Sequence, residues 1–214
     1  MKNNHAYSKD MLKLTNSDVS VHAVNTKYQG FFKMNEYSLQ HTLFSGEQSQ
    51  EFTREVFERG DAVVLMAYDV EQDKLLLIEQ FRPGAIRGED SPWLLEFIAG
   101  MFGENESPVD VAVREAKEEA NITITADNLV PIMQYLSSPG GMSERIHLYY
   151  ANFDSNNVEV GTTFGLPEEN EDILLHLVSL DEAASLLSQG KITNASTIIG
   201  VQWLMMNQSG LGIK

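Results

Sequence analysis

The chain has 214 residues, a mass of 23.9 kDa, 43% apolar residues and a formal net charge of -16 at pH 7, which suits one large domain or one domain with a small appendage. An excess of acid this large repels phosphate backbones and anionic lipid, so we expect neither nucleic acid nor a membrane as a partner. The sequence has no cysteine, which excludes disulfides and zinc–thiolate sites, and no apolar run near the roughly 18 residues of a membrane helix, so we expect a cytoplasmic protein.

The N-terminal part of the chain reads as a small β-meander. Residues 18–25, 30–44 and 50–60 alternate loosely between apolar and polar side chains, which predicts about three strands. Three short strands are too few to fold alone, and no Pro- or Ser-rich linker follows them near residue 55, so we expect this piece to dock rigidly. We place this N-terminal β domain at residues 1–55 and a larger domain at residues 56–214.

The larger domain mixes strands and helices. Strands are predicted at 61–69, 74–82, 93–100, 129–136, 145–153 and 173–179, and helices at 108–120, 181–189 and 194–208. Because the two kinds of element do not alternate strictly, the pattern predicts an α/β (α+β) sandwich in which helices cover a mixed sheet.

The predicted helix at 108–120 carries an unusual charge pattern. Ser107 is a suitable N-cap and Pro108 suits the first helical position, so the start of the helix is well marked. Helical spacing then places an apolar stripe beside an edge that holds three glutamates. The stripe consists of Val109, Ala112, Val113, Ala116 and Ala120, and the glutamates are Glu115, Glu118 and Glu119. Like charges four residues apart repel, so the pattern indicates a nearby cation.

Two interpretations of this acidic edge remain open. An acidic helix face is most often solvated surface in an acidic protein. The alternative is a site for a hard divalent cation such as Mg²⁺, for which Mn²⁺ could substitute, because such ions take carboxylate oxygens and keep positions for a substrate phosphate. Arg114 is best interpreted as a structural partner that orients Glu115 or its neighbours.

The stretch "GMFGENESPVDVAVREAKEEANI" resembles the Nudix box, in which a glycine, a Glu, an Arg-Glu pair, a Glu-Glu pair and a final glycine with an apolar residue stand at fixed offsets. The matching positions are Gly100, Glu106, Arg114, Glu115, Glu118, Glu119 and Ile122. Asn121 departs from the pattern because it stands where the family has glycine. Asn is the best non-glycine residue for a left-handed helix C-cap, so we expect the fold to tolerate it.

The resemblance extends to the bacterial ADP-ribose pyrophosphatase branch of this family through "YQGFF", "ERG", "LIEQFR", "PWLLEFIAGM", "SPGGMSER" and "PEENEDI". It implies a Nudix α/β/α sandwich with a mixed sheet, preceded by a small N-terminal β domain that is exchanged across a homodimer. It also implies Mg²⁺-dependent hydrolysis of the diphosphate of ADP-ribose to AMP and ribose 5-phosphate.

Site residues follow from the resemblance position by position. The implied metal ligands are Ala99 through its carbonyl, Glu115, Glu118, Glu119 and Glu171. Glu169 is implied as the general base, with Glu115 as a second catalytic residue, although the sequence leaves open whether Glu169 or Glu171 takes the proton. Diphosphate hydrolysis needs such groups, because metal ions neutralise the oxygens while a carboxylate accepts the proton of the attacking water.

The resemblance also implies a substrate-binding set. Its members are Phe31, Phe32, Arg54, Glu55, Arg59, Arg82, Met101, Ser138, Pro139, Gly140 and Glu144. A phenylalanine face can stack on adenine, although only one of two adjacent phenylalanines in a strand is expected to do so. The guanidinium of Arg82 can bind a diphosphate bidentately, and Glu144 can accept from a ribose hydroxyl. The histidines form no ligand spacing and receive no role.

Two alternatives to ADP-ribose hydrolysis stay open at this point. The chain could hydrolyse another nucleoside diphosphate-sugar, because selectivity depends on a few pocket contacts that the sequence does not place. It could also be a non-catalytic regulatory module of the Nudix type that binds a nucleotide sugar. The complete glutamate set argues against the second alternative, because binding alone does not require it.

Overall fold

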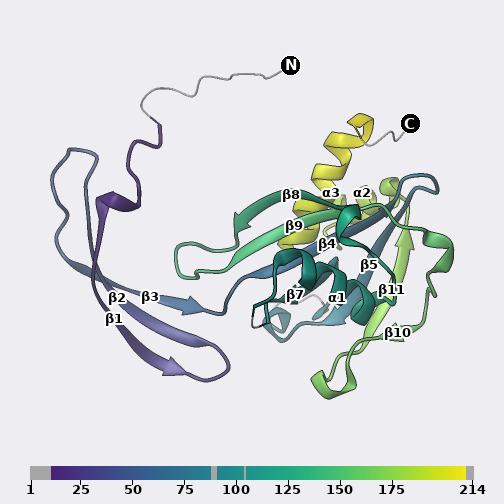
Figure 1. The fold of residues 1–214 in the computed structure, drawn as a ribbon, viewed down its shortest axis with the longest axis horizontal. Helices are drawn as coiled ribbons and strands as arrows, with labels where there is room; N and C mark the ends of the chain where they lie inside the picture. Colours follow the sequence, from purple (N-terminus) through teal and green to yellow (C-terminus); the bar gives the residue numbers. More distant parts are fainter. Residues whose placement is uncertain (1–10, 88–90, 104, 211–214) are drawn as a thin grey trace. The chain divides into compact units, whose positions relative to one another are not determined.

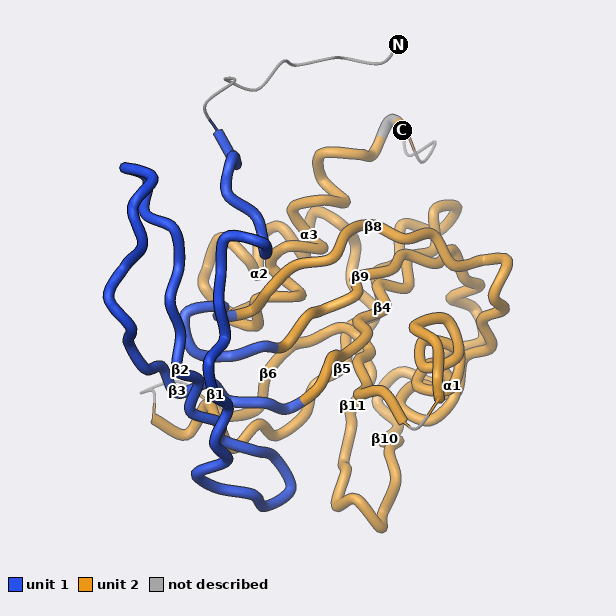
Figure 2. The backbone as a smooth tube through the Cα atoms, turned by 60° about the vertical axis from the view of Figure 1, so that its left-hand side comes forward, with its two compact units in different colours: residues 1–59, 138–143 blue, residues 60–137, 144–214 orange. Residues whose placement is uncertain are grey.

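The structure is a computed structural model that describes residues 11–87, 91–103 and 105–210. The chain forms two compact units (Figure 2). The first takes in the residues up to Arg59 together with Ser138–Ser143, and the second takes in Gly60–Ser137 and the residues from Glu144 onward.

The first unit is a three-stranded antiparallel sheet, as predicted. Its strands are β1 (Val19–Gln29), β2 (Lys33–His41) and β3 (Phe52–Glu58), in the order β1-β2-β3. None of its described residues is buried within the chain, and β1 leaves Val21 and Tyr28 55% and 66% exposed. A sheet needs an apolar face packed on something to be stable, so this unit has no core of its own.

The second unit is built on a mixed sheet, which confirms the predicted α/β class. Its strands are β4 (Ala62–Asp69), β5 (Lys74–Phe81), β6 (Trp93–Glu96), β7 (Ile98–Met101), β8 (Leu129–Leu136), β9 (Arg145–Ala151), β10 (Thr163–Phe164) and β11 (Ile173–Val178). The order is β10-β11-β5-β4-β9-β8, and β4 runs parallel to β9 while the other described pairs are antiparallel. Strand β10 was not predicted, because two residues carry no readable periodicity.

Helices cover both faces of this sheet (Figure 1), and a buried apolar cluster lies under each layer of helices. The helices are α1 (Pro108–Ala120), α2 (Leu180–Ser188) and α3 (Ala195–Asn207). Every residue of β4 is buried; Val64 and Met66 pack into the cluster that contains α2 and α3, whereas Leu65 packs into the cluster that contains α1. A strand covered on both faces is expected to be apolar throughout. The two layers of helices and the sheet between them form the predicted three-layer sandwich. Within the described residues, no helix is long and apolar enough to cross a membrane.

The stretch 93–101 departs from the prediction of one strand. It breaks at Phe97, which is 1% exposed and packs against Gly200 of α3. Before the break, β6 pairs with β5; after it, β7 pairs with β4. The run "WLLEFIAG" reads as one strand because its apolar residues are continuous, whereas the buried aromatic ring divides it between two neighbours. The break places Glu96 and Ala99 on different strands.

Helix α1 has the predicted bounds and caps. Ser107 accepts from the Asp110 N–H in a capping box, and Asn121 closes the helix at φ 52° and ψ 21°, in the left-handed region. The expected tolerance of Asn121 therefore has a direct structural basis. The apolar stripe is rotated from the prediction, because Val111 and Glu119 are buried while Val113 is only partly so. The buried Glu119 brings a carboxylate inside the helix–sheet contact.

Candidate active site

The C-terminal half of α1 faces β7 through its glutamates. Glu119 is 2% exposed, and its Oε2 accepts a hydrogen bond from the Ala99 N–H at 2.9 Å. Beside it, Gly100 lies so close to the carboxylate of Glu115 that a Cβ atom on this glycine would overlap the Glu115 side chain. The glycine of the box is therefore required for space, and it lets β7 approach the helix.

Arg114 ties the glutamates together, as its interpretation as a structural partner requires. Its Nε donates to Glu106 at 2.9 Å, and its Nη1 donates to Glu115 at 2.8 Å and to Glu118 at 2.9 Å. Its Nη2 also reaches the carbonyl of Met101 at 3.3 Å. One guanidinium thus fixes three carboxylates and the end of β7, a geometry that a lysine ammonium does not offer.

Burial dominates the electrostatics of this cluster. It raises the pKa of Glu115 to about 7, although the charge and hydrogen bond of Arg114 oppose the rise. Burial also raises the pKa of Glu119 well above its ordinary value, and the charges of Glu115 and Glu171 raise it further. The hydrogen bond from the Ala99 N–H lowers this pKa, but its effect is smaller than that of burial. Glu171 therefore lies within electrostatic range of both glutamates, and the site holds more negative charge than its surroundings compensate.

These shifts predict how the stability of the metal-free protein depends on pH. The folded pKa of Glu115 is about 7 against an ordinary 4.5, so the folded state holds a proton that the unfolded chain has lost. Stability should therefore fall as pH rises between these two values. We expect urea unfolding in EDTA at pH 5, 6, 7 and 8 to show this fall, and Glu115→Gln to flatten it over the same window. An unchanged slope in the variant would contradict the assignment.

The loop before β11 carries the remaining acidic candidates. Glu171 accepts from the Leu166 N–H at 3.1 Å, and Gly165, at φ 104°, lies against the Glu171 side chain where a Cβ would not fit. Glu169 lies on the 3-10 turn Pro167–Glu169 and is exposed. The fold thus places Glu171 within electrostatic range of Glu115 and Glu119, and it leaves Glu169 exposed.

Arg82 follows β5 and is anchored by a residue that sequence reasoning missed. Its Nε and Nη2 both donate to Oε2 of Glu96, at 3.0 and 2.8 Å, and Glu96 is 3% exposed. The negative charges of Glu96, Glu119 and Glu171 raise the pKa of Arg82 against the effect of its burial. Arg82 therefore lies near the acidic cluster. The signal that could have revealed Glu96 was a lone charge inside the apolar run "WLLEFIAG".

Glu144 is placed differently from the α1 cluster. It is 4% exposed and accepts from the hydroxyl of Ser137 at 2.7 Å. Tyr135 lies close enough for the Glu144 charge to raise its pKa, although burial is the larger cause, and its hydroxyl is 2.6 Å from that of Ser196. A carboxylate held in this way has a fixed direction, which suits an acceptor for a hydroxyl group.

Two predicted aromatic residues of the first unit differ in exposure. Phe31 is 89% exposed, whereas Phe32 is partly buried with its ring edge-on to Phe57 at 5.2 Å between centroids. The guanidinium of Arg59 lies 5.4 Å from the centroid of Phe32. Phe31 is therefore the ring with an open face, in line with the expectation that one of the pair is free to stack.

The other predicted residues of this unit are also at its surface. Arg54 lies over the ring of Phe52 at 4.7 Å and donates to the Thr53 carbonyl, and Glu55 is exposed beside it. The segment 138–140 is exposed, and the Gly141 carbonyl accepts from the Phe57 N–H at 2.8 Å. These side chains and backbone groups are accessible to a ligand.

The residues of the α1 cluster fit a divalent metal ion by their chemistry. Within residues 11–87, 91–103 and 105–210, no three His, Cys, Asp or Glu side chains are arranged to hold an ion together. Each carboxylate instead has a protein partner: Arg114 for Glu115, and backbone N–H groups for Glu119 and Glu171. Oxygen donors with excess negative charge in a partly buried site are what hard cations bind.

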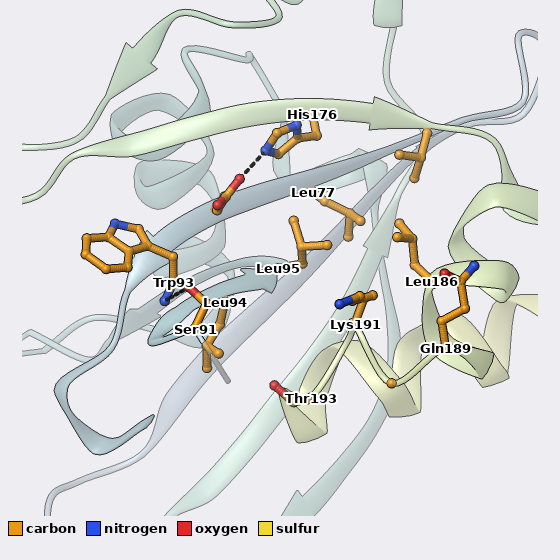
Figure 3. A pocket seen from close by; sticks show the side chains of 13 residues that line it. Leu77, Ser91, Trp93, Leu94, Leu95, His176, Leu186, Gln189, Lys191 and Thr193 are labelled. Carbon is orange, nitrogen blue, oxygen red and sulfur yellow. Dashed lines mark hydrogen bonds and ion pairs between the residues drawn. The ribbon is translucent and has the colours of Figure 1, made fainter. Parts of the chain in front are cut away.

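A separate hollow of about 520 Å³ lies between β5, β6, β11 and the connection from α2 to α3 (Figure 3). Its floor is apolar, with Leu77 and Leu95, and its rim carries a pair between Glu79 and His176 at 2.8 Å. None of the predicted site residues lines it. The hollow is therefore distinct from the carboxylate cluster at α1 and β7.

Comparison with known proteins agrees with this geometry. The NUDIX domain family model matches residues 58–198. The ADP-ribose pyrophosphatase of Escherichia coli K12 is 43% identical over 195 residues, covering 91% of each chain, and that of Haemophilus influenzae is 42% identical, covering 91% of this chain and 89% of its own. The GDP-mannose pyrophosphatase of Yersinia enterocolitica is 30% identical, covering 84% of this chain and 91% of its own.

A solved structure described as an ADP compounds hydrolase shares the fold, with a TM-score of 0.68 and 19% identity over 92% of this chain and 97% of that one. The family model covers well over half of the sequence, and the residues that match its box form the carboxylate cluster tied by Arg114. This chain therefore belongs to the NUDIX domain family.

Proposed function

We propose that this protein hydrolyses the diphosphate of ADP-ribose, with water, to AMP and ribose 5-phosphate. The observation that carries the proposal is the partly buried Glu115 and the buried Glu119 against β7, in a chain that is 43% identical to ADP-ribose pyrophosphatases along nearly its whole length. Two carboxylates withdrawn from water, with raised pKa values, are costly to a fold, so their presence favours a functional role.

The residues that would hold a divalent ion are Glu115, Glu119, Glu171 and the carbonyl of Ala99, with Glu118 close to them. Nudix pyrophosphatases in general need a divalent metal, and we propose Mg²⁺ with Mn²⁺ as a substitute. Such an ion, when bound, supplies positive charge to the diphosphate oxygens and lowers the pKa of water.

The chain's own residues supply the remaining chemistry. Arg114 holds the orientation of Glu115, and Arg82 offers donors to a phosphate whose negative charge the acidic protein otherwise repels. Glu169 is proposed as the base, since its exposed carboxylate can accept the proton of the water that attacks phosphorus. The bond between that phosphorus and the bridging oxygen breaks, and the leaving phosphate keeps the oxygen.

The first unit is proposed to bind the adenine and to be exchanged, as residues 1–55, across a homodimer in the cytoplasm. Its exposed Phe31 offers a stacking face. None of its residues in 11–59 and 138–143 is buried, which supports the exchange, because the exposed apolar side chains along β1 would gain burial from another surface. The molar mass in solution, against 23.9 kDa for one chain, tests the assembly.

A second candidate is hydrolysis of another nucleoside diphosphate-sugar, which the 30% identity to a GDP-mannose pyrophosphatase favours. The purified protein is incubated with ADP-ribose, ADP-glucose and GDP-mannose, each with Mg²⁺ and with EDTA, and the products are separated. We expect AMP and ribose 5-phosphate to form from ADP-ribose faster than products form from the other two substrates, and only when metal is present. Faster cleavage of GDP-mannose would select the second candidate.

A non-catalytic regulatory module remains the competitor from another class. Calorimetry with ADP-ribose and Ca²⁺ measures binding separately from hydrolysis. Binding without cleavage of any of the three substrates in Mg²⁺ would favour the regulatory module and overturn the enzymatic proposal.

A further inference from the structure

Glu96 is a charged side chain enclosed by the fold, and it has partners on every side. It is 3% exposed, and its Oε2 accepts from Arg82 at 2.8 and 3.0 Å and from Gln80 at 3.3 Å. Its Oε1 accepts from the side-chain amide of Asn194 at 2.9 Å. A buried carboxylate is stable only when such donors satisfy it, so the loss of one partner disturbs the others.

The partners divide the two oxygens of Glu96 between two tasks. Oε2 holds the Nε and Nη2 edge of Arg82, which fixes the plane of the guanidinium. Among the described residues, Nη1 of Arg82 makes no hydrogen bond, and the side chain is 41% exposed. Arg82 is thus anchored by one edge and offers the other to a ligand, the arrangement that directed binding of a phosphate needs.

Asn194 holds the second oxygen of Glu96 from the start of α3. It is the N-cap of that helix, and its Oδ1 accepts from the Thr197 N–H at 3.1 Å and from the Thr197 hydroxyl at 3.2 Å. These two bonds fix the orientation of the Asn194 side-chain amide. Its Nδ2 consequently points to Glu96 and donates to it. The cap of α3 therefore determines where the carboxylate of Glu96 lies. The positive end of the helix dipole favours the same negative charge.

We propose that Asn194 is a positioning residue for substrate binding, which acts through Glu96 to aim Arg82 at the diphosphate of the substrate. The proposal rests on the function proposed above, because it assumes that Arg82 contacts a phosphate. It assigns a substrate-binding consequence to the N-terminus of α3, a helix whose apolar side chains otherwise serve the core.

Asn194→Ser separates the two tasks of the residue. Serine is as good an N-cap as asparagine, so α3 keeps its cap, but its short hydroxyl no longer donates to Glu96 as the amide does. Loss of one hydrogen bond to a charged group is expected to raise KM for ADP-ribose about tenfold, with kcat within about threefold of the wild type. The melting temperature should fall by a few degrees, because the buried carboxylate of Glu96 loses one of its donors.

Ser179→Ala is the matched control. Ser179 caps α2 by accepting from the Glu182 N–H at 3.1 Å, and it has no part in the proposed site. This variant should lower the melting temperature at least as much as Asn194→Ser does while leaving KM unchanged. An equal rise of KM in both variants would show a general effect of helix capping and overturn the proposal.

The decisive test is the coupling between Asn194 and Arg82. If Asn194 acts through Arg82, Asn194→Ser should raise KM no more than about twofold in an Arg82→Lys background, because the fork that Glu96 orients is gone. Additive effects of the two substitutions would refute the inference.

A second readout does not depend on catalysis. The Nε–H signal of Arg82 in the nitrogen–proton NMR spectrum, assigned by its loss in Arg82→Lys, reports the bond to Glu96. It should broaden or shift in Asn194→Ser and persist in Ser179→Ala; an unchanged signal in Asn194→Ser overturns the inference. Absent ADP-ribose turnover in the wild type would instead defeat the proposed function, and this spectrum would still decide whether Asn194 positions Arg82.

Discussion

Glu119→Gln is expected to lower kcat for ADP-ribose by roughly a thousandfold without weakening the fold, since loss of one preorganised electrostatic group costs 10²–10³ in turnover and loss of a metal ligand adds to it. Glutamine keeps the shape of the side chain and can still accept from the Ala99 N–H. It also removes a carboxyl group whose burial raises its pKa well above the ordinary value. The metal-free variant should therefore be at least as stable as the wild type in urea.

The same substitution at Glu71 is the control, because Glu71 is exposed in the turn between β4 and β5. Glu71→Gln should change neither turnover nor stability. If Glu119→Gln kept wild-type turnover, the carboxylate would have no role in catalysis. If it unfolded the protein, Glu119 would be a structural residue, and the assignment to the metal site would be wrong.

Gly100→Ala is expected to reduce turnover at least a hundredfold with a change of only about 1 kcal/mol in the free energy of unfolding. The added Cβ would overlap the end of the Glu115 side chain, which is flexible and can rotate away. Rotation relieves the overlap at little cost to the fold, but it takes the carboxylate from its bond with Arg114. Turnover with Mg²⁺ and urea unfolding, measured on one preparation, separate the two effects.

Gly210→Ala gives the comparison for this variant. A Cβ at Gly210 meets nothing within 4 Å, and neither this glycine nor Gly100 has a positive φ. Alanine is therefore not forced into the left-handed region in either variant, and only Gly100→Ala disturbs a carboxylate. Wild-type turnover in Gly100→Ala would mean that the position of Glu115 does not matter for catalysis.

The elements with strong local signals could be predicted from the sequence. Helix α1 begins and ends where Ser107, Pro108 and Asn121 indicate, because caps are properties of a few adjacent residues. The strands of both units were found from their apolar periods, except for β10 and for the division of the predicted strand at 93–100 into β6 and β7. The pairing of Arg114 with Glu118 also follows from helical spacing, since residues four apart are neighbours on a helix surface.

The features that the sequence did not reveal depend on distant partners. The break at Phe97 arises because Gly200, more than 100 residues later, leaves room for the ring. Glu96 is satisfied by Arg82 and Asn194, which lie on other elements. The burial of Val111 follows from its packing against Val63 of β4, which local spacing does not contain. Tertiary packing, rather than local preference, determined each of these.

The break at Phe97 limits insertions and deletions in the stretch 93–101 of related chains. Glu96, which holds Arg82, and Ala99, which meets Glu119, are separated by two residues, although they belong to strands with different neighbours. One inserted or deleted residue between them would turn one of the two contacts to the opposite face of the sheet. Homologous chains should therefore gain and lose residues in the connections outside 93–101, while this stretch keeps a constant length during evolution.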